Sequence, residues 1–170
     1  MNFKLFELDK TFKNFLIAIL FVLTTGMVAG LIYLNYTTDY TPKGATQRFN
    51  GTSIEFEMDD INIPENYPKP ISEMLITTHN HILGFAFIFF ITGLIFNFNS
   101  IINGFWKSFL LIEPTISIVI TFGSIWLMRF VNEDFVYLTI LSSILLYLSF
   151  FIMAGCSAYE LKFKTLSNHN

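Results

Sequence analysis

Two histidines stand where a polar segment runs into an apolar one, and they are the side chains of this sequence best suited to chemistry. His79 and His81 lie just before the apolar run 85–96. At about 100° per residue, a helix places His81 on one stripe with Glu73 and Thr77 and turns His79 about 200° away. An ionisable group in hydrocarbon costs about 2.5–3.5 kcal/mol unless it is paired or hydrated. We therefore expect His81 to face neighbouring helices and His79 to face headgroups or a loop.

Imidazole and carboxylate groups in this pattern are typical ligands of a transition metal. His79, His81 and Glu73 could supply three nitrogen or oxygen ligands to an open zinc or copper site. Histidines two residues apart chelate less well on a helix than a pair spaced i, i+4, so an acidic group from a nearby loop would have to help. Proton transfer is the alternative: a relay from His81 towards Glu113 spans about 9 Å along the membrane normal and needs bridging waters.

Histidine is also the usual axial ligand in haem-binding helix bundles, which makes haem b a second cofactor to consider. Bis-histidine ligation needs imidazoles on facing helices, whereas His79 and His81 share one helix. The remaining histidine, His169, lies near the C-terminus and is expected at the opposite membrane face. A His/Met site stays open, with the methionine coming from another span: Met27, Met128 or Met153.

A second polar pattern follows one face of the apolar segment after residue 105. Glu113, Ser117, Thr121, Ser124 and Met128 are spaced i, i+4, i+8, i+11 and i+15. Such a regular stripe on a membrane-spanning helix faces protein rather than lipid. The polar interior of the bundle is predicted to include Thr77, Glu113, Ser117, Thr121 and Arg129.

Two further spacings predict how helices are held together. Ser142, Ser149 and Cys156 recur every seven residues, which is typical of a seam between helices packed at about +20°. Arg129 and Glu133 are spaced i, i+4, which predicts a salt bridge at the membrane edge. Gly26 and Gly30 form a small-xxx-small pair that lets another helix approach closely.

The composition indicates an integral membrane protein, whose first partner is the lipid bilayer. The 170 residues are 53% hydrophobic, 18% aromatic and only 14% charged, with a mean hydropathy of +0.55. Soluble domains carry about 25% charged residues. A net charge of −3 without a basic stripe argues against nucleic acid as a partner. The single cysteine leaves no intrachain disulfide framework.

Four apolar segments are long enough to cross a hydrocarbon core of about 30 Å. We predict an all-α membrane protein, a four-helix transmembrane bundle in one domain over residues 1–170. Its helices are expected at about 14–36, 71–97, 105–128 and 135–159. The loop 37–70 is expected to form a short extracytoplasmic strand or loop cap over the histidines. The polar and apolar alternation from Ser53 to Met58 predicts the strand, and a disordered acidic loop is the alternative.

Lysine and arginine positions predict the orientation. Six lysines flank the bundle on the side of the two termini, against four basic residues on the other side. The positive-inside rule then places both termini in the cytoplasm of a bacterial inner membrane. The length of the first apolar segment argues against a cleaved signal peptide.

Several short motifs follow one another along the chain. They are Thr-Pro-Lys-Gly44 with Arg48-Phe-Asn-Gly51, Glu73 with Thr78-His-Asn-His81, Ser124-Ile-Trp-Leu-Met-Arg-Phe130, and Ala158-Tyr-Glu160. In this order they resemble a family of bacterial four-span inner-membrane proteins of unassigned function, with a Thr-His-x-His segment at the start of the second helix. The resemblance covers nearly the whole chain. It implies an all-helical bundle with a long first extracytoplasmic loop, and it implies no reaction.

The leading functional hypothesis is a non-catalytic accessory subunit of a larger bacterial inner-membrane complex, in a respiratory or transport setting, with other membrane-protein subunits as partners. Twenty-one phenylalanines supply broad apolar faces for lipid or for such subunits. The alternative is a small haem- or metal-binding membrane protein in electron transfer or metal handling, with His79 and His81 as ligands. An enzyme is least favoured, because one histidine-bearing helix without a clear nucleophile leaves most catalytic roles unfilled.

Overall fold

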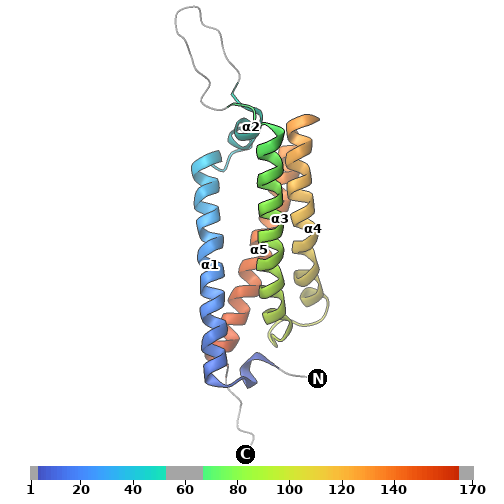
Figure 1. Cartoon of the computed structure of the whole chain (residues 1–170). Helices are drawn as coiled ribbons and strands as arrows, with labels where there is room; N and C mark the ends of the chain where they lie inside the picture. Colours follow the sequence, from blue (N-terminus) through green and yellow to red (C-terminus); the bar gives the residue numbers. More distant parts are fainter. Residues whose placement is uncertain (1–3, 53–66, 165–170) are drawn as a thin grey trace, which may run out of the picture.

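The computed structural model describes residues 4–52 and 67–164, and every regular element in these ranges is helical. A short 3-10 turn, η1 (Leu5–Glu7), precedes α1 (Lys10–Thr38), α2 (Pro42–Asn50), α3 (Ile71–Asn97), α4 (Phe105–Phe130) and α5 (Phe135–Phe163). Four of these helices, α1, α3, α4 and α5, are long and apolar enough to cross a membrane. The predicted all-α, four-helix transmembrane bundle is therefore confirmed (Figure 1).

The bundle has two distinct ends. α1 begins and α5 ends at one of them, which we call the termini end, and α2 lies at the other, the α2 end (Figure 1). α1 begins at Lys10 rather than near residue 14, because the Asp9 carboxylate caps it by accepting a hydrogen bond from the Phe12 amide at 3.0 Å. α5 continues beyond residue 159 to Phe163.

Helix α2 is a departure from the expected loop over residues 37–70. Thr41 caps it by accepting from the Gly44 amide at 2.9 Å, and Pro42 occupies its first turn, where a missing N–H is not needed. A side chain at Gly44 would overlap the carbonyl oxygen of Thr38, so this tight junction between α1 and α2 requires glycine. The strand predicted from Ser53 to Met58 lies outside the described residues.

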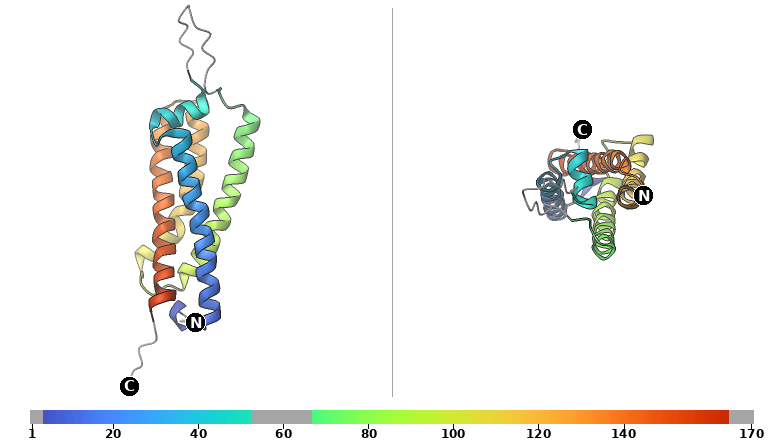
Figure 2. Two further views of the ribbon diagram at one scale, coloured as in Figure 1. Left: turned by 90° about the vertical axis from the view of Figure 1, so that its left-hand side faces the viewer. Right: turned by 90° about the horizontal axis from the view of Figure 1, so that it is seen from above.

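Helix α2 covers the end of the α4–α5 pair (Figure 2). The Thr46 hydroxyl lies 4.0 Å from the Met128 sulfur, and the Asn50 side-chain amide donates to the Met128 carbonyl at 3.4 Å. Met128 is 1% exposed beneath this cover. Helix α2 packs on α4 and α5, so the described part of residues 37–70 does not form the predicted cap over His79 and His81, which are exposed.

Burial differs sharply between the spanning helices. Of the most apolar eighteen-residue window, 44% is buried in α4 but only 11% in α1. The core gathers between α3, α4 and α5 around Phe96 and Phe150, both 0% exposed. α1 approaches α5 at Gly30, where an added Cβ would lie 3.0 Å from the Tyr147 hydroxyl, whereas a Cβ at Gly26 would have no such neighbour within 4 Å. Only Gly30 of the predicted glycine pair permits a close contact within the chain.

Candidate functional site

The histidine segment lies on α3 near the α2 end and faces α4 on one side. The His81 ring lies 5.6 Å from the ring of Phe122 on α4 and 6.2 Å from that of Phe85. His81 Nδ1 lies 2.8 Å from the Thr77 carbonyl oxygen. Because a carbonyl can only accept, Nδ1 carries the proton and Nε2 is left as the free ring nitrogen. His81 therefore turns towards the bundle as expected, although its side chain stays exposed at the edge.

A hydrogen bond joins α3 to α4 just beside His81. The Trp126 indole N–H donates to the Thr78 hydroxyl at 2.9 Å. Thr78 and Trp126 belong to two of the motifs named in the sequence analysis, so these two motifs meet in space. This bond favours one rotation of α3 against α4, and Thr78 lies one turn before His81 on α3.

The other predicted ligands do not converge on His81. Glu73 is exposed and forms an ion pair with Lys69, with Nζ and Oε2 3.2 Å apart. His79 is also exposed. Over residues 4–52 and 67–164, no three histidine, cysteine, aspartate or glutamate side chains come close enough to hold a metal ion. His79, His81 and Glu73 thus remain predicted ligands. A metal bound by them would need further ligands from outside the described residues.

The predicted salt bridge between Arg129 and Glu133 is wrong for the described part of the chain. There, the one ion pair within 4.0 Å is Lys69–Glu73, and Glu133 instead accepts from the Asn50 side chain at 3.2 Å. α4 ends at Phe130, so the helical i, i+4 spacing is lost before Glu133 is reached. The Arg129 guanidinium lies 5.1 Å from the ring centroid of Phe130, and its Nε is buried without a hydrogen-bond partner.

The polar stripe of α4 is buried, and it is completed by α5. Glu113 is 8% exposed and Ser117 3% exposed. The Ser117 hydroxyl donates to Glu113 Oε1, and the Ser149 hydroxyl of α5 donates to Glu113 Oε2 at 2.5 Å. Both carboxylate oxygens of this intramembrane glutamate are therefore satisfied by the chain's own serines.

Two more hydroxyl pairs continue this contact towards the α2 end. Thr121 donates to Ser142 at 2.8 Å, and the Ser124 and Thr139 hydroxyls lie 2.7 Å apart. Together with the pairs at Glu113 they form what we call the α4–α5 polar seam: Glu113, Ser117, Thr121, Ser124, Thr139, Ser142 and Ser149. The seven-residue recurrence in α5 correctly placed Ser142 and Ser149 on this seam.

On the side of α4, the neighbour of His81 is the aromatic ring of Phe122 rather than a polar side chain that could lead to Glu113. Phe122, its neighbour on α4, lies nine residues from Glu113, which is about 13 Å along a helix. The described hydrogen bonds do not join His81 to Glu113. The proton relay considered above would need groups or waters beyond these bonds.

A third polar cluster, at the termini end, was missed by sequence reasoning. Glu160 is 0% exposed, and its carboxylate accepts from the backbone N–H of Ser100 at 2.6 Å and from the Ser100 hydroxyl at 2.8 Å. Asn99, 2% exposed, donates to the Cys156 carbonyl at 3.1 Å and accepts from two following amides. Glu160 lies four residues after Cys156, so extending the seven-residue seam of α5 by one turn would have found it.

These observations define a class: a multi-pass helical membrane protein in which α4 and α5 are joined by a seam of paired, buried polar side chains. Residues 39–168 match the model of a family described as a transmembrane helical domain, and the chain belongs to that family. No curated protein and no solved structure matches the chain.

Proposed function

We propose that residues 1–170 form a single transmembrane domain that acts as a non-catalytic accessory subunit of a larger complex in a bacterial inner membrane. A respiratory or a transport complex is the setting in which we would look first. Other membrane-protein subunits are the proposed partners. The observation that carries this proposal is that the side chains of the α4–α5 polar seam hydrogen-bond to one another, above all at Glu113.

A buried carboxylate in a membrane protein is usually a sign of transport or catalysis. Here both its oxygens accept hydrogen bonds from serines of α4 and α5, and the hydroxyls beyond it pair with one another. Polar groups arranged in this way join helices to each other. This favours a structural role for the interior and leaves the outer surface as the part that would serve a function.

Helix α1 offers the surface best suited to a partner subunit. Val22 and Ile32 are each 65% exposed, and the small residues Thr25 and Ala29 between them are exposed and one turn apart. Small residues one turn apart let two helices approach closely, which matters in a membrane because packing, not the hydrophobic effect, drives association there. We place the partner against this face of α1.

Photo-crosslinking tests this placement. A photoreactive amino acid is introduced at Val22 or Ile32 in native membranes, and at Val119 of α4 or Ile144 of α5, which are 64% and 58% exposed, as matched controls. We expect the two α1 positions to trap the same protein in a fixed ratio, verified by native mass spectrometry, while the controls trap lipid only. Monomeric chain with no adduct at any position would refute the proposal.

The proposed orientation places both termini in the cytoplasm. The basic residues at the termini end are Lys4, Lys10, Lys13, Lys107, Lys162 and Lys164, against Lys43, Arg48, Lys69 and Arg129 at the α2 end. In a Cys156→Ser background, Lys43→Cys should react with a membrane-impermeant thiol reagent on intact spheroplasts, and Lys162→Cys only after lysis. The reverse labelling would mean that the orientation is inverted.

A second candidate function is binding of haem b or a transition metal through His81, with His79 as the other predicted ligand. It is favoured by the hydrogen bond from His81 Nδ1 to the Thr77 carbonyl. Histidines that bind metals usually hold one ring nitrogen in this way and present the other. A Soret band or a stoichiometric metal lost on His81→Ala would support it, and a colourless, metal-free wild-type preparation from native membranes would exclude it.

A further inference from the structure

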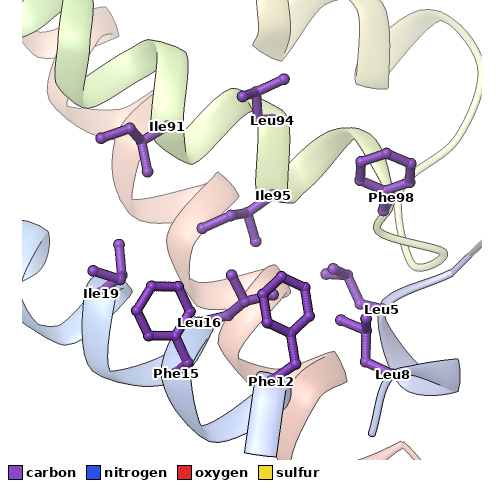
Figure 3. Close-up of a pocket in the computed structure, with 10 residues that line it drawn as sticks. All are labelled: Leu5, Leu8, Phe12, Phe15, Leu16, Ile19, Ile91, Leu94, Ile95 and Phe98. Carbon is purple, nitrogen blue, oxygen red and sulfur yellow. The ribbon is translucent and has the colours of Figure 1, made fainter.

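An apolar groove opens between α1 and α3 near the termini end (Figure 3). Its volume is about 410 Å³, within the range of small-molecule sites. Leu8, Phe12 and Leu16 form one side, and Ile91, Leu94 and Ile95 form the other. All its lining side chains are apolar, so the groove suits a hydrocarbon chain and offers nothing to orient a polar molecule inside it.

The termini end of the bundle, where the groove lies, carries excess positive charge. Six lysines lie at the termini end, against three described carboxylates, which leaves an excess of three positive charges there. Those carboxylates already accept other bonds: Glu7 from the Lys4 amide, Asp9 from the Phe12 amide and Glu160 from Ser100. Within the described residues, no lysine at this end has a carboxylate within 4.0 Å.

Two of these ammonium groups converge beside the groove on Phe6, which lies between the groove residues Leu5 and Leu8. Lys13 Nζ donates to the Phe6 carbonyl at 2.8 Å, and Lys164 Nζ lies 5.0 Å from the centroid of the Phe6 ring. Lys164 Nζ also donates to the Ser100 hydroxyl at 2.7 Å. An ammonium has three N–H donors, so each of these two lysines keeps two N–H groups available. The pair is placed to meet an anion at the membrane surface directly beside the apolar groove.

We propose that this groove holds one acyl chain of an anionic phospholipid, with the lipid phosphate bound by Lys13 and Lys164. Lipid tails are as apolar as leucine, so the hydrophobic effect cannot favour the groove over bulk bilayer. Selectivity must come from the charge at the rim and the fit of the chain. The lipid comes from the leaflet at the termini end, whichever way the protein is oriented, so this inference does not depend on the proposed subunit role.

Native mass spectrometry of the full-length chain in non-ionic detergent tests the proposal, with phosphatidylglycerol or phosphatidylcholine added in mixed micelles. We expect one phosphatidylglycerol to be retained per chain. Lys13→Gln should weaken retention about fivefold, the effect of one basic residue at an anionic surface. Lys10 lies on the same helix but about 180° from Ile19, so Lys10→Gln is the matched control and should change little.

Filling the groove tests the acyl-chain site separately. Leu94→Trp and Ile91→Trp, at positions 51% and 37% exposed, should each abolish retention, and Val119→Trp, at a 64% exposed position of α4, should not. Circular dichroism verifies that each variant is folded, and two groove variants guard against one failing to fold. Three results would each overturn the proposal and indicate a non-specific lipid shell. They are equal retention of the two lipids, equal effects of Lys10→Gln and Lys13→Gln, and a loss of retention in Val119→Trp as large as in the groove variants.

Discussion

The α4–α5 pair is held together by polar contacts, whereas helix α1 is held to the bundle mainly by apolar packing. α4 and α5 share buried polar contacts along the seam from Glu113 to Thr139. The hydroxyls of Thr25, Thr37 and Thr38 in α1 donate instead to carbonyls of α1 itself. Separating α4 from α5 in lipid would leave polar groups unpaired, whereas moving α1 away would mainly exchange one apolar contact for another.

This difference indicates which helices are held to each other most firmly. A polar seam holds the α4–α5 pair together because unpaired polar groups are costly in hydrocarbon. α1 lies against α3 and α5 mainly through apolar packing and leaves its opposite face exposed, with Val22 and Ile32 each 65% exposed. The proposed docking of a partner on α1 follows from this asymmetry.

The largest expected effect is at Glu113, where the seam can be broken. Glu113→Leu removes both acceptors and leaves the Ser117 and Ser149 hydroxyls without them, so we expect a loss of about 2 kcal/mol in the free energy of unfolding. Glu113→Gln keeps one acceptor oxygen and should cost clearly less. Denaturation in detergent micelles, followed by circular dichroism, measures both.

The Gln variant is also the informative control. If Glu113→Gln is as damaging as Glu113→Leu, the negative charge itself is required, and it must be balanced by a cation that the described contacts do not include. In that case the side chains of the α4–α5 polar seam would not satisfy Glu113 on their own, and the structural role proposed for them would lose its main support.

A smaller effect is expected where α1 meets α5. Gly30→Val forces a side chain against the Tyr147 hydroxyl, and we expect a loss of about 1 kcal/mol, the low end for overpacking, because the atom in the way is the end of a side chain. Gly26→Val is the matched control, because a Cβ at Gly26 has no such neighbour within 4 Å. This variant should hardly change the free energy of unfolding. The same unfolding assay compares the two. Tyr147→Phe should partly rescue Gly30→Val, and equal damage at both glycines would show that α1 packs differently.

Helical periodicity predicted much of the fold and part of the site. The spacing of Glu113, Ser117 and Thr121 placed them on one face, and burial of that face follows because a membrane offers no other partner for them. The spacing could not predict that Ser149 would supply the second hydrogen bond to Glu113. That depends on how far α5 slides along α4, which is set by packing over their whole length.

The errors of the sequence analysis lie at helix ends, where tertiary contacts decide. Residues 42–50 are rich in turn formers, yet a threonine cap and a proline in the first turn start a helix that packs over the end of α4. The Arg129–Glu133 pair fails because α4 stops at Phe130. Glu160 received no role in the sequence analysis, but the loop after α3 folds back over it and supplies the donors of Ser100.

The smallest effect is expected at helix α3, which is joined to α4 by a hydrogen bond from an indole. Trp126→Phe keeps the aromatic ring but removes the donor to Thr78, and interhelical hydrogen bonds in membranes contribute about 0.6 kcal/mol on average. Trp106→Phe, at a 65% exposed position, is the matched control and should not change stability. Because the Trp126 bond also favours one rotation of α3, a spectroscopic probe near His81 should shift in Trp126→Phe and stay unchanged in Trp106→Phe. If Trp126→Phe changes neither the stability nor the signal of the probe, α3 is held by apolar packing, as α1 is.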